Sequence, residues 1–261
     1  MKHTKSLLLS LLIVFLAFEA SAKCSKTLRI GINETLWPPY LSRKEGNVFG
    51  LEINALNTLF KNSSYCLKYV FYPTSARMLA ELKAGKVDVL MAATKTATRA
   101  KFAYFTKPYR QEVMALFQHK DKPKIGGEVE SLIIAGNTFA LNAGSYYGIA
   151  FEKLIQDFYN DQLVHLPNAA RRFKMLSKKR VDYVVEDKLA GEYFIQTKEY
   201  TDVIYSGTDA NKTPVRYMLS KVSLTTADLE SINQLIEAHK SVLSDLFSSS
   251  AASDTHLYPK I

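Results

Sequence analysis

The feature that most constrains the fold is a regular alternation of short apolar strands with amphipathic helices, which occurs twice along the chain. In the first block the pattern predicts strands at residues 28–32, 67–72 and 87–92, with helices at 51–60 and 75–84 between them. Strands that are joined through helices run parallel and cross over right-handedly. We therefore expect an α/β fold in which the first block forms a mainly parallel sheet flanked by helices.

The second block repeats this order after a charged segment, residues 120–130, that reads as a linker. A strand at 113–118 precedes this linker. After it, the predicted strands are 139–142, 163–166 and 181–185, and the predicted helices are 149–159, 169–177 and 189–196. A strand at 215–219 and a long helix at 226–247 remain at the end. Two similar halves with a segment left over imply two lobes, between which the chain crosses near 113–118 and again near 214–219.

The first residues have the pattern of an export signal. Lys2 and Lys5 precede an apolar run at 7–18, and an Ala-Ser-Ala sequence ends at Ala22. The apolar run is too short to span a bilayer as an anchor. Lys23 stands where a lipid-attachment motif needs a small residue before Cys24. The sequence therefore predicts a signal peptide at 1–22 that is cleaved after Ala22, and a periplasmic product without a lipid anchor.

The only two cysteines, Cys24 and Cys66, each stand a few residues before a predicted strand. If those strands are parallel neighbours, both cysteines reach the same end of the sheet. An oxidising compartment then favours a disulfide, which stabilises a loop of this size by about 4 kcal/mol in the entropic description. The alternative is two unpaired, small apolar residues. We favour the disulfide.

Several function classes find no support in the sequence. The formal charge is +9, but the basic residues are scattered, which does not indicate a nucleic-acid-binding arm. The five histidines are dispersed without zinc spacing, and no P-loop, Gly-x-Ser-x-Gly elbow or dinucleotide fingerprint occurs. We therefore expect no metal, no cofactor and no nucleic-acid partner. At 47% hydrophobic residues the chain can bury one large or two smaller cores.

The strongest candidate site follows the strand at 87–92. There the chain runs through Thr94, Thr96 and Arg99 into a new helix. The carboxyl end of a parallel strand is where ligands bind in open α/β sheets. A helix start offers free N–H groups to an anion, and arginine offers a planar fork to a carboxylate. The alternative is that Thr96 merely caps the helix and Arg99 is a solvated charge, and this stretch alone leaves both open.

Several short motifs occur in a fixed order: LRIG at 28–31, WPPY at 37–40, FGLE at 49–52, GKVD at 85–88, TATRAK at 96–101, FTKPY at 105–109, NAGS at 142–145 and RVDYVVED at 180–187. Together they resemble the bacterial extracellular solute-binding proteins of family 3. The resemblance covers nearly the whole chain after the signal peptide. Each motif by itself is weak, whereas the ordered set is specific.

The resemblance implies a two-lobed, Venus-flytrap-like protein of the periplasmic-binding-protein-like type II. Such proteins are not enzymes: they close on a small polar solute, usually an amino acid, and deliver it to the ABC permease of an importer in the inner membrane. We expect a monomer. The expected lobes are residues 23–115 for lobe 1 and 116–214 for lobe 2, with 215–261 returning to lobe 1 and ending in the C-terminal helix.

The resemblance also implies roles for single residues. Arg99 matches the arginine that grips the α-carboxylate of the ligand, and Asp187 matches the acid that receives its α-ammonium. Further ligand contacts are implied at Trp37, Thr94, Thr96 and Ser145. A buried charge without a partner costs several kcal/mol, so a cation and an anion from opposite lobes would favour the closed state once the ligand is bound.

Some positions depart from the family pattern and stay open. Arg77 stands at the first turn of a helix beside the expected cleft, where it is either a solvated charge or a contact to a second acidic group of the ligand. Tyr146 either packs against its neighbours or lines the pocket. Glu52, where the family usually has aspartate, is interpreted as an acid that supports a helix start.

Two other functions compete with solute import. The family resembles cyclohexadienyl dehydratases, which eliminate water and carbon dioxide from prephenate-like acids and need a general acid. The candidates for that acid are Glu34, Glu52 and Glu186, none of which lies in a distinctive motif. The third function is a sensory module that presents its ligand to a membrane receptor. The sequence fixes neither the ligand nor the choice between transport and sensing.

Overall fold

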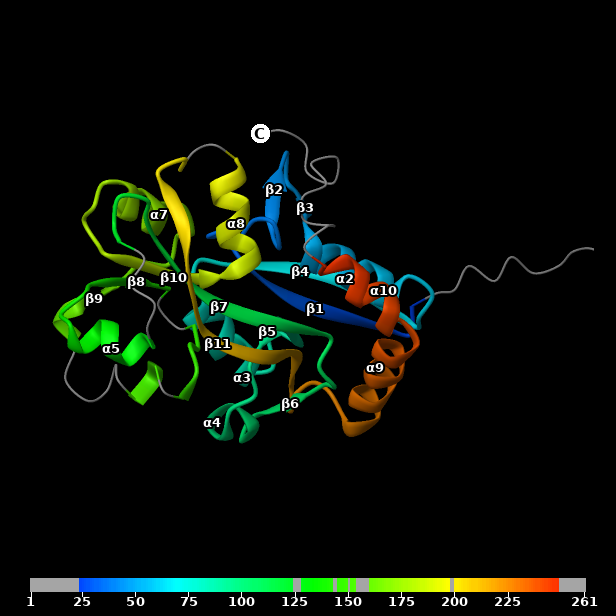
Figure 1. Cartoon of the computed structure of the whole chain (residues 1–261). Coiled ribbons are helices and arrows are strands. Elements are labelled where there is room, and N and C mark those ends of the chain that lie inside the picture. Colours follow the sequence, from blue (N-terminus) through cyan, green and yellow to red (C-terminus); the bar gives the residue numbers. More distant parts are fainter. Residues whose placement is uncertain are drawn as a thin grey trace, which may run out of the picture.

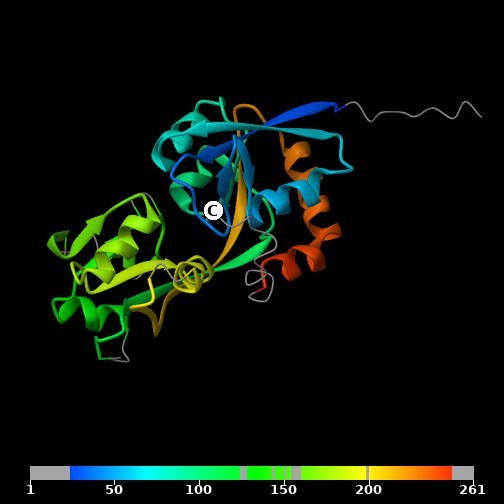
Figure 2. The same ribbon diagram turned by 90° about the horizontal axis from the view of Figure 1, so that it is seen from above.

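The computed structural model describes residues 24–123, 128–142, 145–149, 151–153, 160–197 and 200–248. Figure 2 shows two bodies, each made of a sheet with helices, that are joined by two long strands. These strands are β7 (Arg110–His119) and β11 (Val203–Ser220), which pair antiparallel with each other. The predicted two-lobed α/β fold is confirmed.

Lobe 1 is built on parallel strands in which β1 (Lys26–Asn33) lies between β4 (Tyr65–Tyr72) and β5 (Val89–Ala93). The short strand β6 (Ala103–Phe105) pairs antiparallel with β11. A separate hairpin is made by β2 (Ser42–Lys44) and β3 (Asn47–Phe49). The helices of this lobe are α2 (Leu51–Phe60), α3 (Ser75–Lys83), α4 (Ala97–Ala100), α9 (Thr226–Ala238) and α10 (Lys240–Leu246).

Lobe 2 contains the parallel strands β9 (Leu163–His165), β8 (Phe139–Leu141) and β10 (Tyr183–Asp187), and β10 pairs antiparallel with β7. Its helices are α5 (Val129–Ile134), α7 (Ala169–Ser177), α8 (Lys188–Gln196) and the single 3₁₀ turn η1 (Asn160–Gln162). The complete strand order is β4-β1-β5-β11-β7-β10-β8-β9, with β6 beside β11 (Figure 1). Both lobes therefore share β11.

The entry to α2 ties the loop that holds Trp37 to the core of lobe 1. Gly50 has φ +125°, and a Cβ there would lie 2.5 Å from the Tyr40 carbonyl oxygen. The first backbone N–H groups of α2 donate to carbonyls of this loop: Leu51 to Pro39 and Glu52 to Tyr40, each at 3.1 Å. A glycine is required at this approach, because any side chain would push the loop off the helix.

Several predicted elements are confirmed. Helices at 51–60 and 169–177 have the predicted bounds, and the Cys24–Cys66 disulfide is formed at the neighbouring ends of β1 and β4. Gly85 follows α3 with φ +72°, the left-handed geometry that commonly ends helices. The proposed signal peptide at 1–22 lies outside the described residues, as does most of the helix expected at 149–159.

Other elements differ from the prediction. The helix expected at 226–247 is two helices, because His239 leaves helical geometry with φ −110° and ψ 15°. The strand expected at 215–219 starts at Val203, because its polar first part pairs with β7. Helix α5 begins at Val129, inside the segment expected to be a linker. The short strands β2, β3 and β6 were not predicted.

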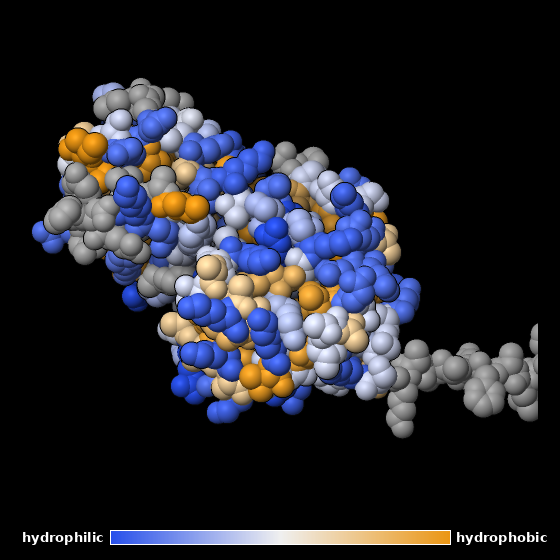
Figure 3. Space-filling view, turned by 90° about the horizontal axis from the view of Figure 1, so that it is seen from below, coloured by the Kyte–Doolittle hydropathy of each residue, from blue (hydrophilic) through white to orange (hydrophobic). Residues whose placement is uncertain are grey.

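The surface carries only scattered apolar side chains among the described residues. The large exposed ones lie in four separate parts of the chain: Ile134, Ile149, Val222 and Val242. Figure 3 shows hydrophobic residues on one face as small groups between hydrophilic ones. Within the described part of the chain, no helix has the length and apolar character needed to cross a membrane.

Candidate functional site

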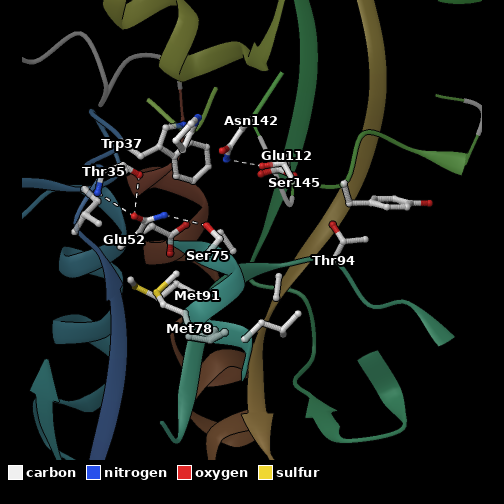
Figure 4. A pocket seen from close by; sticks show the side chains of 18 of the residues that line it. Thr35, Trp37, Glu52, Ser75, Met78, Met91, Thr94, Glu112, Asn142 and Ser145 are labelled. Carbon is white, nitrogen blue, oxygen red and sulfur yellow. Dashed lines mark hydrogen bonds between the residues drawn. The ribbon is translucent and has the colours of Figure 1, made fainter. Parts of the chain in front are cut away.

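A cavity of about 320 Å³ lies between the two lobes and is lined by residues of both (Figure 4). Lobe 1 contributes the carboxyl ends of β1 and β5, including Asn33 and Thr94. Lobe 2 contributes Asn142, which follows β8. The cavity thus lies where open parallel sheets place their ligands, and its volume is at the small end of the range of about 300–1,000 Å³ for small-molecule pockets.

Arg99 is presented to this cavity by the turn after β5. The Thr96 hydroxyl accepts the Arg99 N–H at 3.2 Å and so caps α4, and the Arg99 guanidinium donates to the Thr94 carbonyl at 3.1 Å. Arg99 and Thr94 line the cavity, whereas Thr96 does not. Burial lowers the pKa of Arg99, and among the described residues no carboxylate forms a salt bridge with it.

The chain bends sharply just before this turn. Ala92 has φ +50°, a left-handed conformation that alanine rarely adopts. Its N–H donates to the Tyr109 hydroxyl at 2.9 Å, which holds the bend in place. Residues strained in this way tend to cluster at functional sites. Ala92 also lines the cavity.

On the side of lobe 2, the loop after β8 supplies polar groups. The Asn142 side-chain amide donates to the Ser145 hydroxyl at 2.7 Å, and the Asn142 N–H donates to the Tyr147 hydroxyl at 2.6 Å. Ser145 and Tyr146 both line the cavity. The structure therefore places these two predicted residues opposite Thr94 and Arg99.

Trp37 also lines the cavity and reaches across to lobe 2. Its indole N–H donates to Glu186 at 3.0 Å. The second oxygen of Glu186 accepts from Arg172, a buried side chain of α7. The two lobes are thus in direct contact beside the cavity.

Glu112 on β7 is a cavity residue that the sequence analysis missed. Its side chain is 7% exposed, and among the described residues it makes no hydrogen bond, the nearest cation being Arg110 at 3.8 Å. Burial raises the pKa of Glu112 to about 8. The available signal was an acid directly before the predicted strand at 113–118 and its run of apolar residues.

A second charged group, the hinge cluster, lies beside the cavity and consists of Glu52, Arg110 and Asp187 with Tyr40 and Tyr109. Arg110 on β7 donates to Glu52 at 2.9 Å, and Tyr109 donates to the other Glu52 oxygen at 2.6 Å. The Arg110 guanidinium carbon lies 4.4 Å from the centre of the Tyr40 ring. The hinge cluster is therefore an internally paired network at the start of the first crossing strand.

The structure does not bring Asp187 or Arg77 into the cavity. One Asp187 oxygen accepts from the Tyr40 hydroxyl at 2.7 Å and from the N–H groups of Leu189 and Ala190, which caps α8. Burial raises the pKa of Asp187 to about 6. Arg77 is 59% exposed and pairs with Glu81 at 2.6 Å. Neither residue is among those that line the cavity.

The comparison with family models gives a match over residues 28–249 to "Bacterial extracellular solute-binding proteins, family 3". The chain belongs to this family. The resemblance of the ordered motifs is thereby confirmed, and with it a solute-binding role of the family's kind. A comparison with curated proteins gave no match.

Solved structures with the same fold belong to proteins of several activities. A histidine kinase sensor domain with similarity to periplasmic binding proteins is 22% identical, with a TM-score of 0.72, and covers 84% of this chain and 93% of that one. A mutant of the arginine-binding protein of T. maritima is 24% identical, with a TM-score of 0.70 and the same coverages. An ancestral amino acid-binding protein, a precursor of cyclohexadienyl dehydratase, is 21% identical, with a TM-score of 0.70, and covers 85% and 93%.

Similarity at 21–24% sequence identity defines the fold and does not define the ligand. Among the described residues, no group of three or more His, Cys, Asp or Glu side chains is arranged to hold a metal ion. The cavity offers a ligand charged, hydroxyl, amide and apolar side chains.

Proposed function

We propose that the protein captures a free amino acid between its lobes in the periplasm and delivers it to an ABC importer. The observation that carries this proposal is the Arg99 guanidinium, which lines the cavity between the lobes and forms no salt bridge among the described residues. A partly buried guanidinium without an anion is unfavourable, and a ligand carboxylate would supply that anion in a bidentate geometry. Arg99 is thus assigned to the α-carboxylate of the ligand.

The remaining cavity residues fit the same ligand. Thr94 lies beside Arg99, and Ser145 lies on the opposite lobe, so hydroxyl groups are available to a carboxylate from both sides. Trp37 and Tyr146 present rings to the ligand from lobe 1 and lobe 2. Because contacts come from both lobes, they are complete only when the lobes are closed, and ligand binding favours closure.

The crossing strands define the lobes in this proposal. We place the lobes at 23–115 and 116–214, with 215–261 returning to lobe 1, so that closure is a rotation about β7 and β11. The contacts of Trp37 with Glu186 and of Tyr40 with Asp187 would separate on opening. A signal peptide at 1–22 would bring the chain to the periplasm.

The test begins with the protein purified from the periplasm. Small molecules released on denaturation are identified by mass spectrometry, and the refolded, ligand-free protein is titrated calorimetrically with each of the common amino acids. We expect one amino acid, or a small group of related ones, to bind in the micromolar range or tighter. Uptake of that labelled amino acid by cells with and without the gene then tests delivery. Failure to bind any amino acid would overturn the proposal.

A second candidate function is the elimination chemistry of a dehydratase, and Glu112 is the observation that favours it. With a pKa raised to about 8 by burial, Glu112 is protonated at neutral pH inside the cavity, which is the state that a general acid needs. Incubation with prephenate should then produce an aromatic acid, followed by its ultraviolet absorbance, and Glu112→Gln should stop the reaction. Absence of product would exclude this second candidate for that substrate.

A further inference from the structure

Three carboxylates line the cavity, and two of them are already satisfied by the protein. Both Glu52 oxygens accept hydrogen bonds, from Arg110 and from Tyr109. Both Glu186 oxygens also accept: one from the Trp37 indole and the Asp187 N–H, the other from Arg172. Glu112 is 7% exposed and accepts no hydrogen bond from the described residues. Of the three, Glu112 is therefore the carboxylate without a hydrogen bond, and its salt bridge among the described residues is the long one to Arg110 at 3.8 Å.

The cations of the cavity are matched in the same way. Arg172 is paired with Glu186, whereas Arg99 has no anionic partner among the described residues. Glu152 and, more weakly, Glu112 act electrostatically on Arg99, and of these two carboxylates Glu112 lines the cavity together with Arg99. Arg99 and Glu112 are thus the guanidinium and the carboxyl group of the cavity without a hydrogen-bonded ionic partner, one for each charge of an amino acid backbone.

The other end of the cavity is apolar. Figure 4 shows Met78 and Met91 together at this end, away from Glu112, Asn142 and Ser145. Apolar side chains from α3, β5 and β11 complete it: Leu79, Leu90 and Met218. Methionine is flexible and polarisable, so it adapts to apolar groups of different shapes.

The polar groups closest to the apolar end are occupied with one another. The Asn33 side-chain amide donates to the Ser75 hydroxyl at 2.9 Å, and the Asn33 oxygen accepts from the N–H and hydroxyl of Thr35 at 2.9 and 2.8 Å. Dashed lines in Figure 4 mark these contacts. A ligand side chain that carries a guanidinium, an ammonium or an amide would compete with existing hydrogen bonds there.

We propose that the ligand is an amino acid with an uncharged, apolar side chain, whose ammonium contacts Glu112 and whose side chain packs on Met78 and Met91. This inference rests on the proposed function and names the substrate class of the same site. It replaces Asp187 by Glu112 as the partner of the ammonium, because Asp187 is engaged with Tyr40 and the start of α8. The ammonium takes the place of the proton that the buried Glu112 otherwise holds.

The experiment is a calorimetric titration of the ligand-free protein with L-methionine, L-leucine and L-phenylalanine, and separately with L-arginine and L-lysine. An uncompensated charge in the apolar end costs several kcal/mol, so we expect at least one apolar amino acid to bind about 100-fold or more tightly than either basic one. If a basic amino acid binds best, this inference is overturned while the proposed function stands. If none of the twenty amino acids binds, both are overturned.

A variant with a second carboxylate tests the assignment of the apolar end. Met78→Glu should raise the affinity for L-arginine or L-lysine at least tenfold and lower that for the apolar ligand by a similar factor. Met78→Leu is the matched control and should preserve the wild-type order. Met78 is only partly buried, and thermal melting of both variants shows whether they are folded. An unchanged preference in folded Met78→Glu contradicts the proposal.

The role of Glu112 is tested by a second pair of measurements that does not depend on the folding of Met78→Glu. Glu112→Gln should weaken binding of the preferred amino acid at least tenfold, because the ammonium loses its anion. The same variant should leave unchanged the affinity for the deaminated analogue of that ligand, for instance 4-methylpentanoate in place of L-leucine. Equal losses for both ligands, or no loss for the amino acid, would overturn the role of Glu112.

Discussion

The hinge cluster and the cavity contain the same kinds of charged side chains but differ in how closely those side chains are paired with opposite charges. In the hinge cluster Arg110 and Glu52 are 2.9 Å apart, both 2% exposed, and Tyr109 donates a further hydrogen bond. In the cavity Arg99 is partly buried and forms no salt bridge among the described residues, and Glu112 has no hydrogen bond and a long salt bridge to Arg110 at 3.8 Å. Charges that the fold itself needs are paired within the protein. Charges left without partners indicate what a ligand has to bring.

This difference has a thermodynamic consequence. Removing one member of a buried ion pair strands the other, so damage in the hinge cluster should appear as lost stability. Removing an unpaired charge strands nothing until a ligand arrives, so damage in the cavity should appear as lost affinity. The same substitution made at the two arginines separates these outcomes.

The largest effect is expected from Arg110→Met. This change leaves Glu52 and Asp187 buried without their shared cation, and it should lower the free energy of unfolding by about 3–5 kcal/mol. Urea denaturation followed by circular dichroism measures the loss. Arg99→Met is the matched control and should change stability by less than about 1 kcal/mol. Equal losses at both positions would remove the distinction between the two regions.

The next effect is the loss of ligand binding in Arg99→Met. A ligand carboxylate enclosed without its guanidinium costs about 2–5 kcal/mol, which corresponds to roughly 30- to several-thousand-fold in the dissociation constant. Isothermal titration calorimetry with the ligand identified by mass spectrometry gives the value. Arg99→Lys keeps the charge without the fork and should retain part of the affinity. Wild-type affinity in folded Arg99→Met would refute the site assignment.

The third effect is a dependence of stability on pH. Burial raises the pKa of Glu112 from 4.5 to about 8 in the folded protein, with Arg110, Asp187, Glu186 and Glu52 as its charged neighbours. Between these two values the folded state binds more protons than the unfolded state, so stability falls as the pH rises, by at most about 1.4 kcal/mol per pH unit. Urea midpoints of the ligand-free protein from pH 5 to 8 measure this slope.

Glu112→Gln is the control for the pH experiment and should flatten the slope above pH 6. The raised pKa of Asp187, about 6, contributes with the same sign only at lower pH. At still lower pH the sign reverses, since hydrogen bonds and Lys26 hold the pKa of Asp228 at about 2. A slope that persists in Glu112→Gln above pH 6 would show that another group titrates.

The smallest effect is expected from Asp187→Asn. Asparagine keeps an oxygen for the Tyr40 hydroxyl and for the N–H groups at the start of α8, so stability should fall by about 1 kcal/mol or less. Ligand affinity should stay within about threefold of the wild-type value. A loss of 30-fold or more would indicate that the ligand ammonium contacts Asp187, as the family resemblance implies, and not Glu112.

The sequence predicted those features that depend on local pattern. The stripe of apolar residues at 51–60 gave helix α2 with its observed bounds, and the strand starts beside Cys24 and Cys66 predicted the disulfide. The turn after β5 identified Arg99 as a cavity residue, because hydroxyls and a guanidinium at a strand end are visible in the chain itself.

The features that the sequence did not predict depend on which face of a strand a residue occupies and on pairing with segments far away in the chain. Glu186 and Asp187 are adjacent on β10, and alternate residues of a strand face opposite sides, so a shift of one position decides which acid meets the cavity. Motif matching does not resolve that choice. Glu112 escaped notice because its burial depends on how β7 crosses between the lobes. The polar first part of β11 reads as a loop until its pairing with β7 is known.

The sharing of β11 by the two lobes also bears on how the chain would fold during the proposed export. Strand β5 needs the Arg216–Leu219 part of β11 as its neighbour, although more than a hundred residues separate them in the chain. A polypeptide that crosses a membrane from its N-terminus onward has the strands of lobe 1 outside long before their last partner arrives. The strands that pair in lobe 2, from β7 to the first part of β11, all precede that partner in the chain and can pair before it arrives. In that case the cleft between the lobes is completed late, after the chain up to Ser220 and the helices that follow it have emerged.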